Sequence, residues 1–95
     1  MRITFDPTKR ALTPQDRGLD FKDARLVFGG PSLDVPDIRH DYGEARVRTV
    51  GYLGGRMVTV VWTPRGKARR VISMRLCNDR EQARYESAIQ RHDAR

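Results

Sequence analysis

Residues 65–85 read R-G-K-A-R-R-V-I-S-M-R-L-C-N-D-R-E-Q-A-R-Y, and this segment decides the expected fold of the chain. Its first half, Lys67–Leu76, alternates with a period of two, which predicts a β-strand. One face of that strand would carry Arg70, Ile72, Met74 and Leu76, and the other Arg69, Val71, Ser73 and Arg75. A helix is expected from Asn78 to about Arg91, because Asn78 is a good N-cap and Glu81 completes a capping-box pattern.

The residues before this segment predict the rest of the sheet. Strands are expected at Arg46–Leu53 and Met57–Thr63. Gly54-Gly55 and Pro64-Arg65-Gly66 suit the tight hairpins that would connect the three strands. Leu33–Ile38 alternates weakly and contains a proline, so it is expected as an edge strand at best. These patterns predict an antiparallel meander of about four strands.

The N-terminal part is expected to be mainly helical. Ile3–Phe5 is a short strand candidate, and Asp6-Pro7 then suits the start of a helix, which Pro14 would interrupt. A second helix is expected over Leu19–Phe28, with Asp20 as its cap. The sequence thus predicts a single α+β domain over the whole chain. Two N-terminal helices and a C-terminal helix would lie on one face of the antiparallel sheet.

The net charge of +7 comes entirely from the second half of the chain. Residues 1–45 hold seven Lys/Arg and eight Asp/Glu (a balance of −1), whereas residues 46–95 hold twelve and four (a balance of +8). Sixteen of the nineteen basic residues are arginine, whose planar fork binds phosphate oxygens two at a time. A polyanionic partner is therefore expected, nucleic acid first, and a solvated basic surface is the alternative.

The remaining composition narrows the class of protein. The sequence has no apolar run of about 18 residues and no basic-then-apolar N-terminus, so neither a membrane-spanning nor a secreted protein is expected. The single cysteine, Cys77, cannot form an intramolecular disulfide, which suits a cytoplasmic protein. Cys77 is expected as a small buried residue, and Trp62 as a core residue rather than a platform for stacked bases.

Seven short motifs, taken in order, resemble those of one protein family. They are F-D-P (Phe5–Pro7), R-G-L-D-F (Arg17–Phe21), A-x-x-V-F (Ala24–Phe28), Y-G-E-x-R (Tyr42–Arg46), G-R (Gly55–Arg56), R-x-I-S-x-R (Arg70–Arg75) and E-x-x-x-Y (Glu81–Tyr85). Together they resemble the BrnT family of type II toxins, over nearly the whole chain.

This resemblance implies a small ribonuclease toxin with a RelE-like fold that inhibits translation and growth. It also implies a partner, a BrnA-like antitoxin with a ribbon-helix-helix DNA-binding part, in an assembly of two toxins and two antitoxins. Operator DNA would be bound only through the antitoxin. The chain departs from many relatives at Pro14, at Leu76, where a basic residue is common, and at Trp62, where histidine is frequent.

The resemblance also implies functional residues. The catalytic positions would be Glu44, Arg46, Arg70, Arg75, Arg80, Glu81 and Tyr85. From the residues themselves, Arg65, Lys67 and Arg69 surround a hairpin and are expected to attract RNA, with Arg84 on the following helix. Arg46 and Arg48 share one strand face, so an ordinary solvated face is an alternative for both.

The expected chemistry needs neither a metal nor a cofactor. The ribose 2′-OH attacks the adjacent phosphate, and fixed positive charge stabilises the phosphorane. Arg75 is the leading candidate, because it precedes the N-terminus of the last helix. The proton-transfer groups stay open among Glu44, Glu81, Tyr85 and His40, and Glu81 is equally expected to serve only its capping box.

Three alternatives remain at this stage. The acidic stretch with Asp34, Asp37, His40, Asp41 and Glu44 contains oxygen ligands for Mg²⁺, but its spacing matches no known cage. A non-catalytic module that binds nucleic acid would use the same arginines. A subunit that serves only to assemble a repressor complex would touch neither RNA nor growth.

Overall fold

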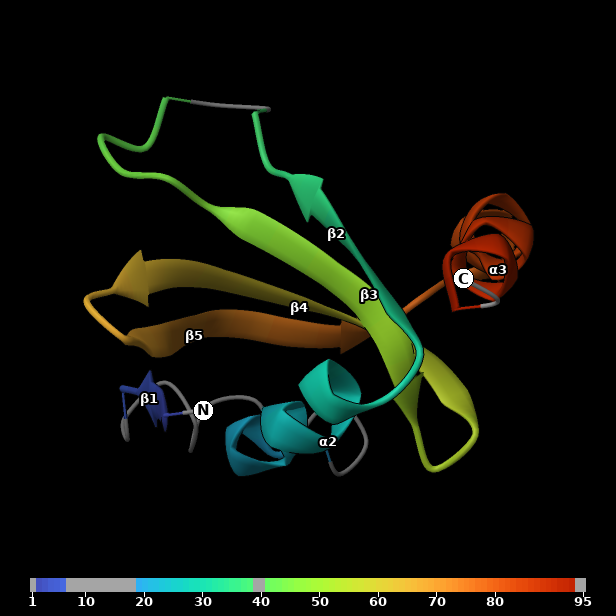
Figure 1. Ribbon diagram of the computed structural model, residues 1–95, viewed down its shortest axis with the longest axis horizontal. Coiled ribbons are helices and arrows are strands. Elements are labelled where there is room, and N and C mark those ends of the chain that lie inside the picture. Colours follow the sequence, from blue (N-terminus) through green and yellow to red (C-terminus); the bar gives the residue numbers. More distant parts are fainter. Residues whose placement is uncertain (1, 7–18, 39–40, 94–95) are drawn as a thin grey trace.

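The computed structural model describes residues 2–6, 19–38 and 41–93, and its centre is one five-stranded sheet (Figure 1). The strands are β1 (Arg2–Phe5), β2 (Ser32–Pro36), β3 (Val47–Leu53), β4 (Arg56–Arg65) and β5 (Ala68–Leu76), in the order β1-β5-β4-β3-β2. The meander β2 to β5 is antiparallel, as the sequence predicts, and β2 forms one edge. The expected interrupted helix after Asp6 lies outside the described residues.

The prediction of an antiparallel sheet of about four strands is wrong in one respect. The N-terminal strand β1 joins the sheet and pairs with β5 in parallel, Ile3 opposite Arg69 and Phe5 opposite Val71. The sheet is therefore mixed. The period-two pattern locates a strand, but the edge that a short strand joins depends on contacts distant in the sequence.

Both predicted hairpins are confirmed. Gly54 and Gly55 have φ of +60° and +79°, the left-handed backbone that a two-residue hairpin requires, and Gly66 has φ of +58° in the next turn. Pro64 is tolerated inside β4 because the pairing of β3 with β4 ends at Trp62, so no ladder from β3 reaches the proline.

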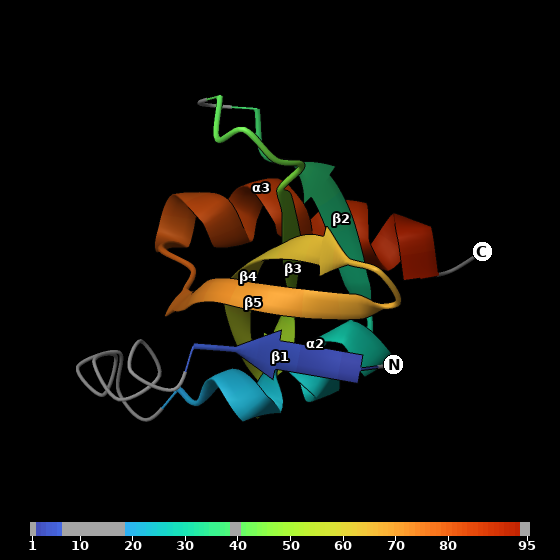
Figure 2. The same cartoon turned by 90° about the vertical axis from the view of Figure 1, so that its left-hand side faces the viewer.

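Two helices pack on opposite faces of the sheet, which corrects the prediction that all helices share one face. A 3-10 turn (Phe21–Asp23) leads into α2 (Ala24–Gly29), and α3 (Asp79–Asp93) follows β5. Figure 2 shows α2 below the sheet and α3 above it. The reason is that β4 is apolar on both faces, so each face needs a cover.

Each face of the sheet therefore has its own core. The core under α2 contains Leu19, Phe21, Ala24, Val27, Val58, Val60, Trp62, Val71 and Met74. The core under α3 is smaller and contains Val50, Met57, Cys77, Tyr85 and Ile89. The expected core roles of Trp62, which is 8% exposed, and Cys77, which is 7% exposed, are confirmed. Among the described residues, no helix is long and apolar enough to cross a membrane.

A β-bulge in β5 contradicts the predicted distribution of its side chains. Val61 pairs with Ser73 but Trp62 pairs with Val71, so Ile72 is the extra residue. Val71 and Met74 consequently both enter the core under α2, although strict alternation would place them on opposite faces. Beyond the bulge the assignment of faces is reversed, and this reversal positions the arginines described next.

Candidate nucleic-acid interface

Helix α3 covers only part of its face of the sheet and leaves an open area with three arginines. Arg75 pairs with Thr59, Arg48 with Val61, and Arg70 with Thr63, so the three arginines flank the same face of β4. Without the bulge, Arg70 and Arg75 would lie on opposite faces, as the alternation predicted. We call Arg48, Arg70 and Arg75 the arginine floor.

Arg75 is held at one end of the floor by the start of α3. Its Nη1 and Nη2 donate to Oε1 and Oε2 of Glu81 at 2.7 and 2.6 Å, a bidentate ion pair. The predicted capping box is confirmed as well. The backbone N–H of Asn78 donates to Glu81 Oε1 at 3.0 Å, and that of Glu81 donates to Asn78 Oδ1 at 2.9 Å. Glu81 thus joins the strand arginine to the helix N-terminus.

This network determines the protonation of Glu81. The hydrogen bonds from Arg75, helped by that from the Asn78 backbone and by the positive charges of Arg75 and Arg48, lower the pKa of Glu81 from 4.5 to about 2, against the opposing effect of burial. A general base works best with a pKa near the operating pH. The environment of Glu81 therefore favours its capping and arginine-holding role over proton transfer.

The middle of the floor contains a residue that sequence reasoning did not select. Arg48 is half-buried, and its Nε is buried with no hydrogen-bond partner among the described residues. A buried donor without an acceptor costs about 1–3 kcal/mol, so such donors are rare, and each calls for an explanation such as a catalytic role or a bound ion. The only sequence signal was that Arg48 shares a strand face with Arg46, a pattern equally typical of a solvated surface.

At the other end of the floor, three predicted arginines lie near the predicted Glu44 carboxylate. Glu44 Oε2 lies 3.3 Å from Arg46 Nε, and Glu44 Oε1 lies 3.1 Å from Arg65 Nη2. These residues line a small cavity together with Asp6, Thr63 and Arg70. We call Glu44, Arg46, Arg65 and Arg70 the Glu44 pocket.

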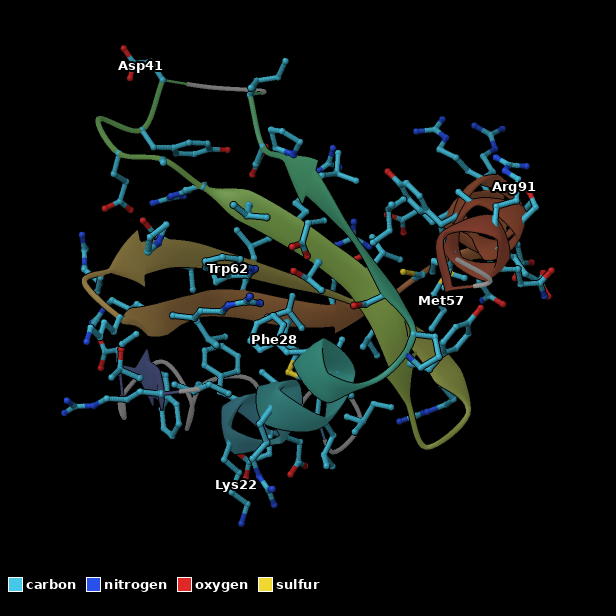
Figure 3. The ribbon with its side chains drawn as sticks, in the orientation of Figure 1. Lys22, Phe28, Asp41, Met57, Trp62 and Arg91 are labelled. Carbon is cyan, nitrogen blue, oxygen red and sulfur yellow. The ribbon has the colours of Figure 1, made fainter. Side chains whose placement is uncertain are left out.

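Arg69, expected to bind RNA, lies on the other side of the sheet. Its guanidinium carbon sits 4.3 Å from the ring centroid of Trp62 and 4.6 Å from that of Phe28, a double cation–π arrangement. Figure 3 shows Trp62 and Phe28 together between the sheet and α2. Trp62 also donates from Nε1 to Thr49 Oγ1 at 2.8 Å. Arg69 is thereby held in the aromatic layer rather than on the arginine floor.

The other predicted residues are more scattered. Tyr85 is 9% exposed and packs in the core under α3 with Val50 and Ile89. Arg80 and Arg84 are exposed on α3, and Lys67 is exposed in the hairpin before β5. Exposed cations of this kind can attract RNA without specificity, which is the role predicted for Lys67 and Arg84 but not for Arg80.

The remaining reactive groups are not part of the arginine floor. Cys77 is buried, its Sγ lies 3.1 Å from Thr59 Oγ1, and burial raises the pKa of its thiol. Asp34 accepts a hydrogen bond from Thr49 at 2.6 Å. In the part of the chain that the structure describes, no three metal-ligating side chains come together; His40 lies outside that part.

Comparison with known proteins assigns the chain to a family. A search of curated proteins found no match. A family model described as ribonuclease toxin, BrnT, of type II toxin-antitoxin system, matches residues 5–81. The match runs from the last residue of β1 to the first turn of α3, and so includes the whole arginine floor and the Glu44 pocket. The chain therefore belongs to the BrnT family of ribonuclease toxins of type II toxin–antitoxin systems.

Proposed function

We propose that the chain is a metal-independent endoribonuclease of the RelE-like type, and that the arginine floor binds the phosphate that is cleaved. The observation that carries this proposal is the pairing of Arg48 and Arg75 on either side of β4, with the buried Nε of Arg48 left without an acceptor among the described residues. An RNA phosphate oxygen is an acceptor of the required charge.

The proposed reaction is an internal transesterification. The 2′-oxygen forms a bond to phosphorus as the 2′-OH loses its proton, and the bond from phosphorus to the 5′-oxygen breaks as that oxygen gains a proton. The products are a 2′,3′-cyclic phosphate and a 5′-hydroxyl. Arg48 and Arg75 would stabilise the extra negative charge of the phosphorane, the type of contribution worth about 3–4 kcal/mol when one donor is removed.

Glu81 is proposed as a positioning residue in this site. Its carboxylate fixes the guanidinium of Arg75 against the start of α3, so the arginine needs little reorganisation when RNA binds. Asp79 and Glu81 already place acidic groups in the first turn of α3. The helix N-terminus is therefore partly neutralised, and the two arginines are proposed as the main source of positive charge.

A type II toxin has an antitoxin partner, and this follows from the family. We further propose that the partner is BrnA-like, with a ribbon-helix-helix part that binds operator DNA, in a complex of two toxins and two antitoxins. The proposed substrate is messenger RNA, so that cleavage inhibits translation and growth. The proposed place of action is the cytoplasm, which also suits a chain with one free cysteine.

The test is cleavage of a 5′-labelled RNA by the purified chain in EDTA, with identification of the new ends. Cleavage that resists EDTA and leaves cyclic phosphates supports the proposal, and Arg48→Ala should lower the rate by about 100-fold. Intact RNA with tight, salt-sensitive binding would instead identify a non-catalytic nucleic-acid-binding module.

A further inference from the structure

The Glu44 pocket lies too far from Arg75 to act on the same phosphate. Arg75 pairs with Thr59 and Arg70 with Thr63, four residues further along β4. At about 3.3 Å per residue, the two positions are about 13 Å apart along the strand. Arg48, opposite Val61, lies midway. The floor thus forms a row of cations whose steps are similar to the separation of successive phosphates in an extended RNA chain.

The pocket is a built structure rather than a chance meeting of surface side chains. Arg46 is held from two directions, because its guanidinium carbon lies 3.9 Å from the ring centroid of Tyr42 and its Nε lies 3.3 Å from Glu44. Thr63 donates from Oγ1 to the carbonyl of Ala45 at 2.6 Å, which fastens this segment to β4. The cavity has a volume of about 190 Å³.

The charge of the pocket matches an anion. Three arginines line the pocket with two carboxylates, those of Asp6 and Glu44, and Glu44 is itself shared between Arg46 and Arg65. The side chain of Arg65 is 53% exposed, so a ligand can reach it from solvent. Net positive charge, a preformed guanidinium and solvent access are the properties of a phosphate subsite.

We propose that the Glu44 pocket binds a second backbone phosphate of the RNA, about two nucleotides from the phosphate that is cleaved, and that the Glu44 carboxylate occupies this position in the free protein. The inference rests on the proposed function for the identity of the substrate. RNA would then lie along β4, from the start of α3 to the Glu44 pocket. Glu44 acts as an internal anion that RNA displaces, not as the proton acceptor of the reaction.

The test uses non-cleavable 2′-O-methyl oligonucleotides of two to six nucleotides, with affinity measured by fluorescence anisotropy at fixed low salt. For the unmodified chain, affinity should rise in a step when the oligonucleotide becomes long enough to reach the pocket. Arg70→Ala should remove most of that step, a loss of about tenfold for the longest oligonucleotide. Glu44→Gln should strengthen binding of the longest oligonucleotide by about threefold to tenfold, because the competing carboxylate is gone.

Arg25→Ala is the matched control, since Arg25 is exposed on α2 on the other side of the sheet and its removal costs the same charge. It should leave the step unchanged. The proposed subsite would be overturned if the step in affinity persists in Arg70→Ala. It would also be overturned if Glu44→Gln weakens oligonucleotide binding or abolishes cleavage of ordinary RNA. If the step in affinity depends on Arg70 but the unmodified chain cleaves no RNA, the subsite is supported and the proposed catalysis is refuted.

Discussion

The ion pair between Glu81 and Arg75 makes a prediction about stability and pH. In the folded chain the pKa of Glu81 is about 2, lowered from 4.5 chiefly by its hydrogen bonds with Arg75. A carboxylate with a depressed folded-state pKa contributes stability above its unfolded pKa and loses that contribution as pH falls through the folded value. The stabilisation by Glu81 should therefore be complete above about pH 5 and absent near pH 2.

The magnitude follows from the size of this shift. A change of about 2.5 pKa units corresponds to at most about 3 kcal/mol. The side chain of Arg75 is 45% exposed, so solvent screens the pair and a contribution of about 1–2 kcal/mol is expected. Glu81→Gln should lower the free energy of unfolding by this amount at pH 7, because glutamine preserves the capping box but not the charge.

The assay is urea denaturation of both chains between pH 2.5 and 7. The difference between them should stay constant from pH 7 to about pH 5 and shrink as the pH falls below that. Glu86→Gln, an exposed change on the same helix, is the control and should stay within about 0.5 kcal/mol of the parent. A constant difference at all pH values, or none at pH 7, would refute the reasoning. In cleavage assays Glu81→Gln should cost about tenfold through loosening of Arg75, whereas loss of a general base costs about 100-fold to 10,000-fold.

Three further predictions concern the cores. Gly51→Ala should destabilise the fold by about 2 kcal/mol in thermal denaturation, because the new methyl group would lie 2.9 Å from an α2 side-chain atom. Gly54→Ala is the control: its methyl group would meet open space, and the φ of +60° alone should cost only about 1 kcal/mol. Trp62→Phe should cost about 1–2 kcal/mol in urea denaturation, since it removes the buried hydrogen bond to Thr49. Cys77 should react with a thiol reagent at pH 7 much more slowly in the folded than in the urea-unfolded chain, because burial both shields the thiol and raises its pKa.

Local patterns identified most of the secondary structure. The capping box at Asn78 and Glu81 was visible because its two residues are three positions apart in the sequence and need no distant partner. The hairpins at Gly54-Gly55 and Gly66 were predictable for the same reason, since the required positive φ restricts the residue type.

Features that depend on distant contacts were not predicted. The bulge at Ile72 reverses the face of Arg70, and only the pairing of β5 with β4 reveals it. The role proposed for Arg48 could not be predicted either, because the lack of a hydrogen-bond partner for its buried Nε among the described residues depends on how the surrounding residues pack. Arg69 is the converse case: the sequence predicted that it binds RNA, whereas in the structure its guanidinium lies against the rings of Trp62 and Phe28.

The arginine floor is proposed to catalyse RNA cleavage, not only to bind RNA. The most direct test compares Arg75→Ala with Arg25→Ala, measuring for each the rate of RNA cleavage and, separately, the affinity for a non-cleavable RNA. Both variants lose one positive charge, but only Arg75 lies on the floor. We expect Arg75→Ala to lower the cleavage rate at least about 100-fold while affinity changes less than about tenfold, and Arg25→Ala to change neither by more than about threefold. Equal losses of cleavage and affinity in Arg75→Ala, matching those in Arg25→Ala, would contradict the proposal.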